Sequence, residues 1–393
     1  VYPLAEYSSL IVEGLPKEGQ TLEQVRDLML GEIEKLKRGE FSDDLLPSVI
    51  NNMKLDAYKE MEDNDSRASK FVDAFINGQE WSDVVGRLDR ISHITKQQII
   101  DFANRHLLNN YVAVYKRQGV DSTVKKIDKP QITPIPSNRD KQSAYVAEIA
   151  NAKAEPIQPV FVDFKRDITF GKTKKGLPVQ YIKNNTNGLF ALQFTFNFGI
   201  EADKRLNTAA GYLDYLGTDK MTADQLKQQF YKLACTYSVS ASRNKTTITL
   251  SGLDENKVEA LKLMEQFLAN AKADADAWKQ FVALEKKARE MNKLNQNANF
   301  SALYSYGIYG PYNPYRNKMT ALELDNANPT DMVKLISSLV NYKHEVAYYG
   351  PTDLKQVIAL VDKNHRTAKK LADVPAGREY EEQLTKENEI LIA

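Results

Sequence analysis

The sequence predicts an α+β protein of repeated two-layer units, each a mostly antiparallel sheet with helices on one face, with one unit truncated. Three observations support this fold class. The order strand, helix, helix, strand occurs twice along the 393 residues. Residues 189–198 place apolar side chains at every second position, as a half-buried strand does. Hydrophobic residues (42%) and charged residues (27%) have the proportions of a soluble globular protein.

The first strand of the repeat is expected at 8–15 and its counterpart at 247–253. Both are rich in β-branched or apolar residues and end at a glycine, Gly14 or Gly252, which are 238 residues apart (252 − 14). An amphipathic helix is expected after each strand. In the first repeat, Thr21 and Gln24 have the spacing of a capping box.

Two further matches follow in the same order. Leu88 and Leu324, each followed by an aspartate, are 236 residues apart (324 − 88). A helix and then a strand are expected after each, at 95–106 and 111–115 in the first copy and at 330–340 and 345–349 in the second. The two strands start 234 residues apart (345 − 111). A shared strand–helix order in unrelated segments is the alternative explanation.

These matches divide the chain into four parts. Residues 1–119 are the C-terminal part of one repeat unit, 120–160 a linker rich in proline and charge with a short helix at 140–154, 161–370 a second unit, and 371–393 a connector toward a further unit. Few residues precede the first matched strand, whereas a long segment precedes its counterpart. We therefore expect the first unit to lack its opening part and the protein to extend upstream.

The second unit shows the clearest local signals. Strands are expected at 167–170, 177–182, 189–198, 237–241, 246–251 and 345–349, helices at 206–216 and 222–233, and three helical stretches before the last strand.

Composition excludes several classes of protein. Charge is nearly balanced, with 53 Lys and Arg against 52 Asp and Glu, so no nucleic-acid partner is expected. No apolar run approaches the roughly 20 residues that a transmembrane helix needs. The single cysteine, Cys235, follows Leu233 and Ala234, which favours a packed core thiol over a reactive one.

At several of these elements the sequence resembles the insulinase/pitrilysin family of inverted-zincin metallopeptidases. The segment 194–202 resembles a family strand with its following turn, and Leu216-Gly217-Thr218 resembles the end of a family helix. Residues 222–226 and 241–250 continue the match, which covers nearly the whole chain outside the linker. The resemblance implies units of the insulinase/processing-peptidase type and a parent protein that is a zinc metalloendopeptidase.

Catalytic family members carry His-x-x-Glu-His on the helix before Gly-Thr, where two histidines bind zinc and the glutamate acts as a base. In this sequence the three positions fall on Thr208, Gly211 and Tyr212, none of which can take the family role. The resemblance therefore implies no catalytic and no metal residue in this chain, and zinc in the upstream part of the parent. Glu285 and Glu290, on a later helix, are interpreted as solvated charges.

Two other groups of residues are weaker candidates for a functional site. The four histidines include no pair at ligand spacing on one helix, and we expect each to be a surface or capping residue. Tyr312, Tyr315 and Arg316 belong to a loop rich in tyrosine, glycine and proline. Hydroxyl and guanidinium groups of this kind suit the binding of peptide carbonyls or a carboxylate. The alternative is that the loop packs on its own unit.

The function predicted on this resemblance is the non-catalytic half of a zinc-dependent peptidase, which forms a chamber wall and a surface for a peptide substrate. Its partners would be the remaining domains of the parent chain, in a homo- or heterodimer, within a bacterial cell envelope or periplasm. The alternative is a scaffold or interaction subunit of the same fold with no peptidase activity in the parent. A third hypothesis is an unrelated hydrolase that uses Cys235 or the tyrosine-rich loop.

Overall fold

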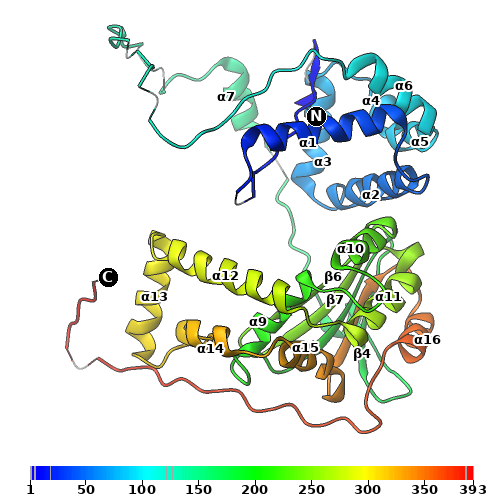
Figure 1. The fold of residues 1–393 in the computed structure, drawn as a ribbon, viewed down its shortest axis with the longest axis vertical. Coiled ribbons are helices and arrows are strands. Elements are labelled where there is room, and N and C mark those ends of the chain that lie inside the picture. The colour runs from blue at the N-terminus through cyan, green and yellow to red at the C-terminus, as the bar shows by residue number, and fades with distance from the viewer. Residues whose placement is uncertain are drawn as a thin grey trace.

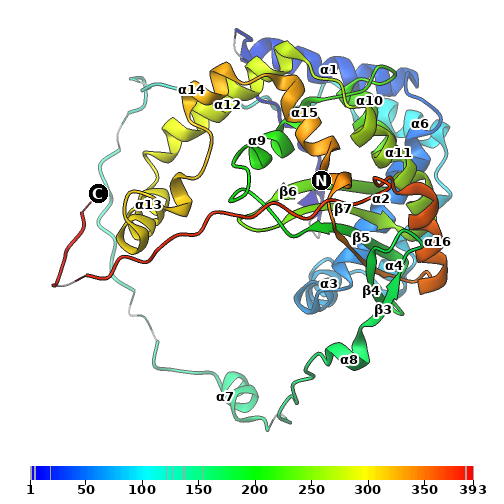
Figure 2. The same ribbon diagram turned by 90° about the horizontal axis from the view of Figure 1, so that it is seen from below.

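The computed structural model describes residues 2–3, 6–17, 19–120, 122–125, 127–135, 137, 139–153, 155–385 and 387–392. A helical region before residue 108 and a sandwich of sheet and helices after residue 164 are joined by a long extended segment (Figure 1). The tail after the last helix runs as an extended chain along the sandwich (Figures 1 and 2).

The sandwich holds a six-stranded sheet of strand order β3-β4-β8-β5-β7-β6. Every neighbouring pair is antiparallel except β4 and β8, which are parallel. The strands are β3 (Thr169–Lys172), β4 (Pro178–Lys183), β5 (Leu189–Phe196), β6 (Cys235–Ala241), β7 (Thr246–Leu253) and β8 (Glu345–Gly350). The predicted α+β class with a mostly antiparallel sheet is confirmed, and each strand expected after residue 167 is present within a few residues of its predicted place.

The alternation of β5 explains the two faces of the sheet. Phe190, Leu192 and Phe194 are buried on the face that the helices cover, whereas Gln193 and Thr195 remain partly exposed on the other face. The helices of the sandwich are α9 (Arg205–Tyr212), α10 (Ala223–Lys232), α11 (Lys257–Asn270), α12 (Ala275–Asn292), α13 (Gln296–Tyr309), α14 (Ala321–Asn326), α15 (Pro329–Ser337) and α16 (Leu354–Asn364), with short 3-10 helices η1 (Leu213–Tyr215), η2 (Asp254–Asn256), η3 (Pro314–Arg316) and η4 (Leu339–Asn341).

The N-terminal region consists of helices: α1 (Leu22–Arg38), α2 (Leu45–Glu60), α3 (Asn64–Ile76), α4 (Trp81–Val85), α5 (Arg87–Ser92) and α6 (Lys96–His106). The predicted capping box of Thr21 and Gln24 is confirmed, and Thr95 forms another at the start of α6. Both place a polar side chain on backbone N–H groups that have no partner inside the helix.

Two strands predicted for the first unit are wrong. Only Ser8–Ser9 (β2) of the expected strand 8–15 is a strand, paired with β1 (Tyr2–Pro3), and residues 111–115 form none. Val112 is 88% exposed. A strand needs a neighbour that accepts and donates its ladder hydrogen bonds, and among the described residues no strand pairs with residues 10–15 or 111–115. The apolar pattern was present, but the pairing partner was not.

The helical region contacts the sandwich through α2. Leu55 and Tyr58 pack against the ends of three elements of the sandwich, at Leu189, Ala234 and Leu253. Polar contacts surround this small cluster: Asn52 Nδ2 donates to Tyr231 O (2.7 Å), Lys54 pairs with Glu255 (3.1 Å), and Asn187 Nδ2 donates to Glu62 Oε1 (3.0 Å).

The connecting segment holds one regular helix of the described residues, α7 (Ala144–Asn151), inside the predicted range 140–154, before the short α8 (Phe164–Asp167). Ala154 and Pro136 of the predicted linker lie outside the described residues. Among the helices that the structure describes, none combines the length and apolar character required to cross a bilayer.

Candidate functional site

The three positions that the sequence resemblance matches to the family's zinc ligands and base, Thr208, Gly211 and Tyr212, lie on α9. Thr208 and Tyr212 are buried, and Tyr212 has no exposed surface. Tyr212 Oη donates to the backbone O of Asp274 (2.6 Å) and accepts from the backbone N of Asp274 (3.0 Å). Both hydrogen-bonding functions of the phenol are thus used at the start of α12. Burial raises the pKa of Tyr212, so the phenol stays neutral.

Aromatic rings fill the space around these positions. The Trp278 ring meets the Tyr212 ring edge-on, with centroids 4.9 Å apart, and the Phe281 ring lies 5.9 Å from it. A Cβ added to Gly211 would be in van der Waals contact with Phe281 Cε2, at 3.5 Å. The surroundings of these positions are a packed aromatic core.

The carboxylates of the later helix are also engaged. Glu285 pairs with Arg289 of the next turn at 2.7 Å, and Glu290 pairs with Lys293 at 2.7 Å. Among the described residues, no group of three or more His, Cys, Asp or Glu side chains is arranged to hold a metal ion. The residues near α9 therefore offer a phenol, an indole and paired carboxylates, which are poor ligands for zinc.

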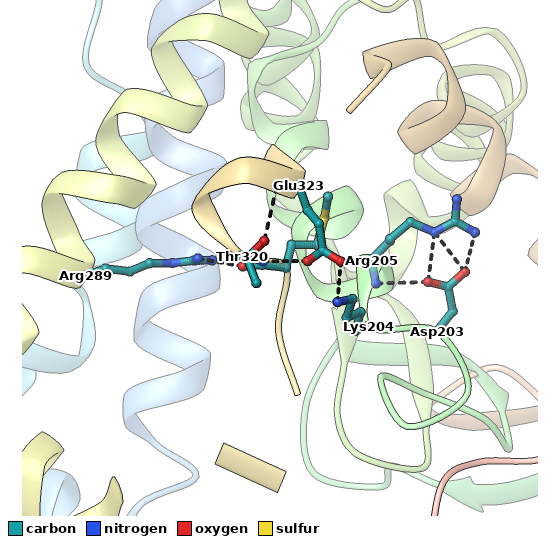
Figure 3. Close-up of polar contacts among 7 residues, drawn as sticks. Asp203, Lys204, Arg205, Arg289, Thr320 and Glu323 are labelled. Carbon is teal, nitrogen blue, oxygen red and sulfur yellow. Dashed lines mark hydrogen bonds and ion pairs between the residues drawn. The ribbon is translucent and has the colours of Figure 1, made fainter. Parts of the chain in front are cut away.

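Polar contacts fix α9 to the neighbouring helices (Figure 3). Lys204 Nζ, at the start of α9, donates to Glu323 Oε1 of α14 at 2.6 Å. Glu323 also accepts from the backbone N of Thr320 at 2.7 Å, which completes the capping box of α14. The hydrogen bond from Lys204 is the main cause that lowers the pKa of Glu323 to about 2. Arg289 of α12 donates to Met319 O at 2.6 Å beside these residues.

The structure brings together two histidines that we expected at the surface or at helix caps. His344, before β8, and His365, after α16, are each 3% exposed, and their Nε2 atoms are 2.9 Å apart. His365 Nδ1 lies 2.6 Å from Glu265 Oε1 of α11, a carboxylate that is also buried. The prediction is wrong for His344, which is buried before β8, whereas His365 is the C-cap residue of α16 and is buried there. Spacing within a single helix does not reveal this pair. Their 21-residue separation is bridged by the strand and helix between them.

The hydrogen-bond partners of these side chains determine which of their ring nitrogens carry hydrogen. His344 Nδ1 lies 2.7 Å from Tyr342 O, and a carbonyl oxygen only accepts, so Nδ1 carries hydrogen. Neutral His344 then accepts at Nε2, and His365 Nε2 must donate. A further proton therefore lies between His365 Nδ1 and Glu265. Arg366 Nε lies 3.5 Å from Glu265 Oε2, so the carboxyl group of Glu265 faces both a ring nitrogen and a guanidinium group.

Cys235 matches the packed thiol that the sequence favours over a reactive one. The side chain is buried, with Sγ 3.9 Å from Leu253 O. Burial raises the pKa of the thiol to about 12, which keeps it protonated and a poor nucleophile at neutral pH.

The residues of the tyrosine-rich loop have separate surroundings. Tyr312 is half-exposed and packs against Tyr380 of the tail, with ring centroids 5.1 Å apart. The ammonium of Lys318 lies 4.7 Å from the centroid of the Tyr315 ring. Arg316 is exposed, and its Nη1 lies 3.4 Å from Pro311 O. The three side chains therefore do not converge on one point, and only Tyr312 contacts a peptide segment.

The sheet ends beside α9 in an edge strand, β6. Ser242 N donates to Lys245 O and Leu253 N donates to Ala234 O, so the pairs 242–245 and 234–253 are hydrogen-bonded pairs. Because such pairs alternate along an antiparallel ladder, Tyr237 and Val239 direct their N–H and C=O groups away from β7. No other described segment forms a backbone hydrogen bond with these groups. The edge therefore offers free donors and acceptors to an extended chain.

No protein-family model and no curated protein matches the chain. Solved structures are similar to it. One is a peptidase M16 inactive domain from Pseudomonas fluorescens, with 16% identity, 54% of each chain covered and a TM-score of 0.45. Another is the periplasmic protease PqqL from Escherichia coli, with 13% identity, 92% of this chain and 43% of that chain covered, and a TM-score of 0.48.

A further similar structure is the ferredoxin protease FusC in complex with Arabidopsis ferredoxin, with 11% identity, 92% of this chain and 43% of that chain covered, and a TM-score of 0.47. This chain spans about half the length of the structures that it matches. The first of these structures is named as a peptidase M16 inactive domain and the other two as proteases, and the similarity to this chain concerns the fold alone.

Proposed function

We propose that this chain belongs to the non-catalytic half of an insulinase-type zinc peptidase, where it forms a chamber wall and holds an extended peptide on the edge of β6. The unpaired backbone groups of Tyr237 and Val239 support this proposal most directly, because they lie on the edge strand that contacts α9. Peptides commonly bind to such an edge by adding a strand. Zinc, the remaining domains of a parent protein, a dimer and a bacterial cell-envelope location belong to the same proposal.

The packed surroundings of α9 support the non-catalytic part. Tyr212 uses both of its hydrogen-bonding functions on Asp274, and Phe281 occupies the space beside Gly211. To bind a metal, this region would have to lose its aromatic packing as well as gain ligands. The purified chain should therefore bind less than about 0.1 equivalents of zinc and cleave no peptide. One equivalent of bound zinc together with activity lost on chelation would contradict the proposal.

The strand edge is tested with two neighbouring proline substitutions. Val239→Pro removes an N–H that points to the free edge, and proline is tolerated on an edge strand. We expect it to weaken the binding of a fluorescein-labelled unstructured 15-residue peptide by about tenfold or more, because one main-chain hydrogen bond and the strand contact are lost. Binding is measured by fluorescence anisotropy, and circular dichroism checks that the fold is kept.

Two further variants distinguish the loss of the N–H group at the strand edge from the effect of a changed side chain and from the loss of a hydrogen bond inside the sheet. Val239→Thr keeps the backbone N–H and should bind the peptide as the unmodified chain does. Ser238→Pro removes an N–H that bonds to β7 and should lower the thermal stability of the sandwich. If the unmodified chain binds no extended peptide at all, a scaffold role for this fold replaces the peptide-binding role. Equal binding by Val239→Pro and the unmodified chain would place the peptide elsewhere.

A further inference from the structure

The tail after α16 follows a defined path. Lys343 N donates to Ala372 O (2.9 Å) and Ala372 N donates to Asn341 O (2.8 Å), which attaches the tail beside the start of β8. It then continues as an extended chain toward the C-terminal end of α13, as both ribbon views show (Figures 1 and 2). Most described side chains of the tail are exposed, as are those of the linker, but the tail also forms backbone hydrogen bonds to the sandwich. The tail is therefore docked on the sandwich by specific contacts.

Two backbone hydrogen bonds hold the tail at its far end. Arg378 N donates to Glu201 O (2.9 Å), in the turn before α9, and Gln383 N donates to Ile308 O (2.6 Å), in the last turn of α13. Glu201 and Ile308 belong to different parts of the sandwich, so the four residues between Arg378 and Gln383 cross from one to the other. Backbone recognition of this kind requires an extended segment and depends little on its sequence.

One side chain between these two hydrogen bonds is held by aromatic rings. The Tyr380 ring lies 5.1 Å from the Tyr312 ring and 5.9 Å from the Tyr309 ring, measured between centroids. The Arg243 guanidinium lies 5.6 Å from the same centroid, and Arg243 is itself paired with Glu201 at 2.5 Å. Two rings and a cation thus form an aromatic subsite for one residue of the tail.

The tail lies close to two glycines, Gly307 of α13 and Gly310 directly after it. A Cβ on Gly307 would lie 3.2 Å from Leu391 Cδ1, and a Cβ on Gly310 would lie 3.4 Å from Gln383 Cγ. Gly310 also has a positive φ of 71°, which L side chains rarely adopt. The tail therefore passes close to the backbone at the end of α13.

The hydroxyl of Tyr380 shows which part of the residue is recognised. The Tyr380 Oη atom is buried and has no hydrogen-bond partner among the described residues. A buried hydroxyl without a partner costs stability, so the subsite gains from the ring and not from the oxygen. Phenylalanine should occupy it at least as well as tyrosine.

We propose that Tyr309, Tyr312 and Arg243 form a binding site for an aromatic residue within an extended peptide, and that residues 378–383 occupy this site within the same chain. No residue of β6 takes part, so this inference stands without the strand-edge function proposed above. While the tail is docked, it excludes other peptides, because a tethered ligand has an effective concentration in the millimolar range. A peptide from another chain binds only where the tail has been weakened.

The experiment uses the full chain and a fluorescein-labelled peptide with the sequence of residues 376–385. The unmodified chain should not bind this peptide in fluorescence anisotropy, whereas Tyr380→Ala, which empties the subsite, should bind it. Tyr312→Ala combined with Tyr380→Ala should bind it about tenfold more weakly than Tyr380→Ala, because the ring contact is lost. Tyr312 is half-exposed, so its replacement should leave the fold intact.

Changes in the peptide test the ligand class. A peptide with Tyr380→Phe should bind the emptied site as tightly as the original peptide or more tightly, and one with Tyr380→Ala should bind about tenfold or more weakly. In the chain itself, chymotrypsin should cut after residue 380 faster in Tyr312→Ala than in the unmodified protein, which needs no added peptide. Equal peptide binding by the unmodified chain and Tyr380→Ala, or cleavage unchanged by Tyr312→Ala, would overturn the proposal.

Discussion

The helical region and the sandwich share a predicted order of elements but differ in what they bury. In the described part of the chain before residue 164, the buried apolar side chains are Val25, Leu55, Ala74 and Ala103, whereas the sandwich holds a continuous core between its sheet and helices. Helices in water gain most of their stability from packing an apolar face. We therefore expect the stability of the helical region to depend on its contact with the sandwich more than the stability of the sandwich depends on the helical region.

Each region contains one tryptophan, which allows the two to be observed separately. Trp81 lies in α4 of the helical region, and Trp278 lies buried in α12 of the sandwich. In the variants Trp81→Phe and Trp278→Phe the fluorescence reports on one region only. Urea unfolding of these two tryptophan variants measures the stability of each region separately.

The largest effect is expected from Glu265→Ala in the sandwich. It leaves His365 Nδ1 without its partner inside the core, and an unsatisfied buried polar group costs up to about 3 kcal/mol of unfolding free energy. The midpoints reported by both tryptophans should fall, since the helical region loses its support. Glu259→Ala, at an exposed position of the same helix, is the control and should change the free energy by less than about 0.5 kcal/mol. A small effect of Glu265→Ala would show that the histidine chain contributes little.

A pH dependence follows from His344 and belongs to the sandwich alone. Burial lowers the pKa of His344 to about 4, whereas an unfolded histidine titrates near 6.5. Between these values the unfolded chain binds more protons, so stability is present above pH 6.5 and falls as the pH drops toward 4. The loss is roughly 3 kcal/mol for a pKa difference of this size. It is measured as the Trp278 unfolding free energy against pH.

His344→Gln is the matched variant, because glutamine can donate to Tyr342 O and accept from His365 Nε2 without titrating. The slope of stability between pH 6.5 and 4 should be smaller in this variant than in the unmodified chain. Identical slopes would mean that other groups cause the acid dependence.

The fold could be predicted where the sequence signal is local. The capping box at Thr21 and the alternation along β5 depend on neighbours within a few residues, and both were found in the structure. Residues 111–115 show the limit of this reasoning. Their pattern suits a strand, yet a strand exists only when another segment supplies its hydrogen-bond partners, which the pattern does not reveal.

The candidate site shows the same limit for side chains. Sequence comparison located Thr208, Gly211 and Tyr212 on one helix, because the helix carries its own spacing. It missed the pair of His344 and His365, which meet through the paths of β8 and α16. It also could not show that residue 380 packs on Tyr312, since the two come from separate segments. One sequence feature could have indicated this contact: the tail has a tyrosine among charged residues, and the chain also has a tyrosine-rich loop.

An intermediate effect is expected at the contact between the two regions. Leu55 is 4% exposed and lies at the centre of the small cluster between α2 and the sandwich. Leu55→Ala should lower the unfolding free energy of the helical region by about 2 kcal/mol, the lower end for a buried leucine. The Trp81 transition should move and the Trp278 transition should not. Leu45→Ala, at an exposed position of α2, serves as the control. Movement of both transitions together would show that the regions unfold as one unit.

The smallest effect comes from two identical capping boxes placed in the two regions. Thr21 Oγ1 accepts from Gln24 N (3.1 Å) at the start of α1, and Thr222 Oγ1 accepts from Gln225 N (3.2 Å) at the start of α10. Thr→Ala at either position should cost about 1 kcal/mol, because the same hydrogen bond is lost. Thr21→Ala should shift only the Trp81 transition, since the sandwich does not rest on α1. Thr222→Ala should shift both transitions, because α10 contacts and supports α2. If both variants shifted both transitions equally, neither region could be said to support the other.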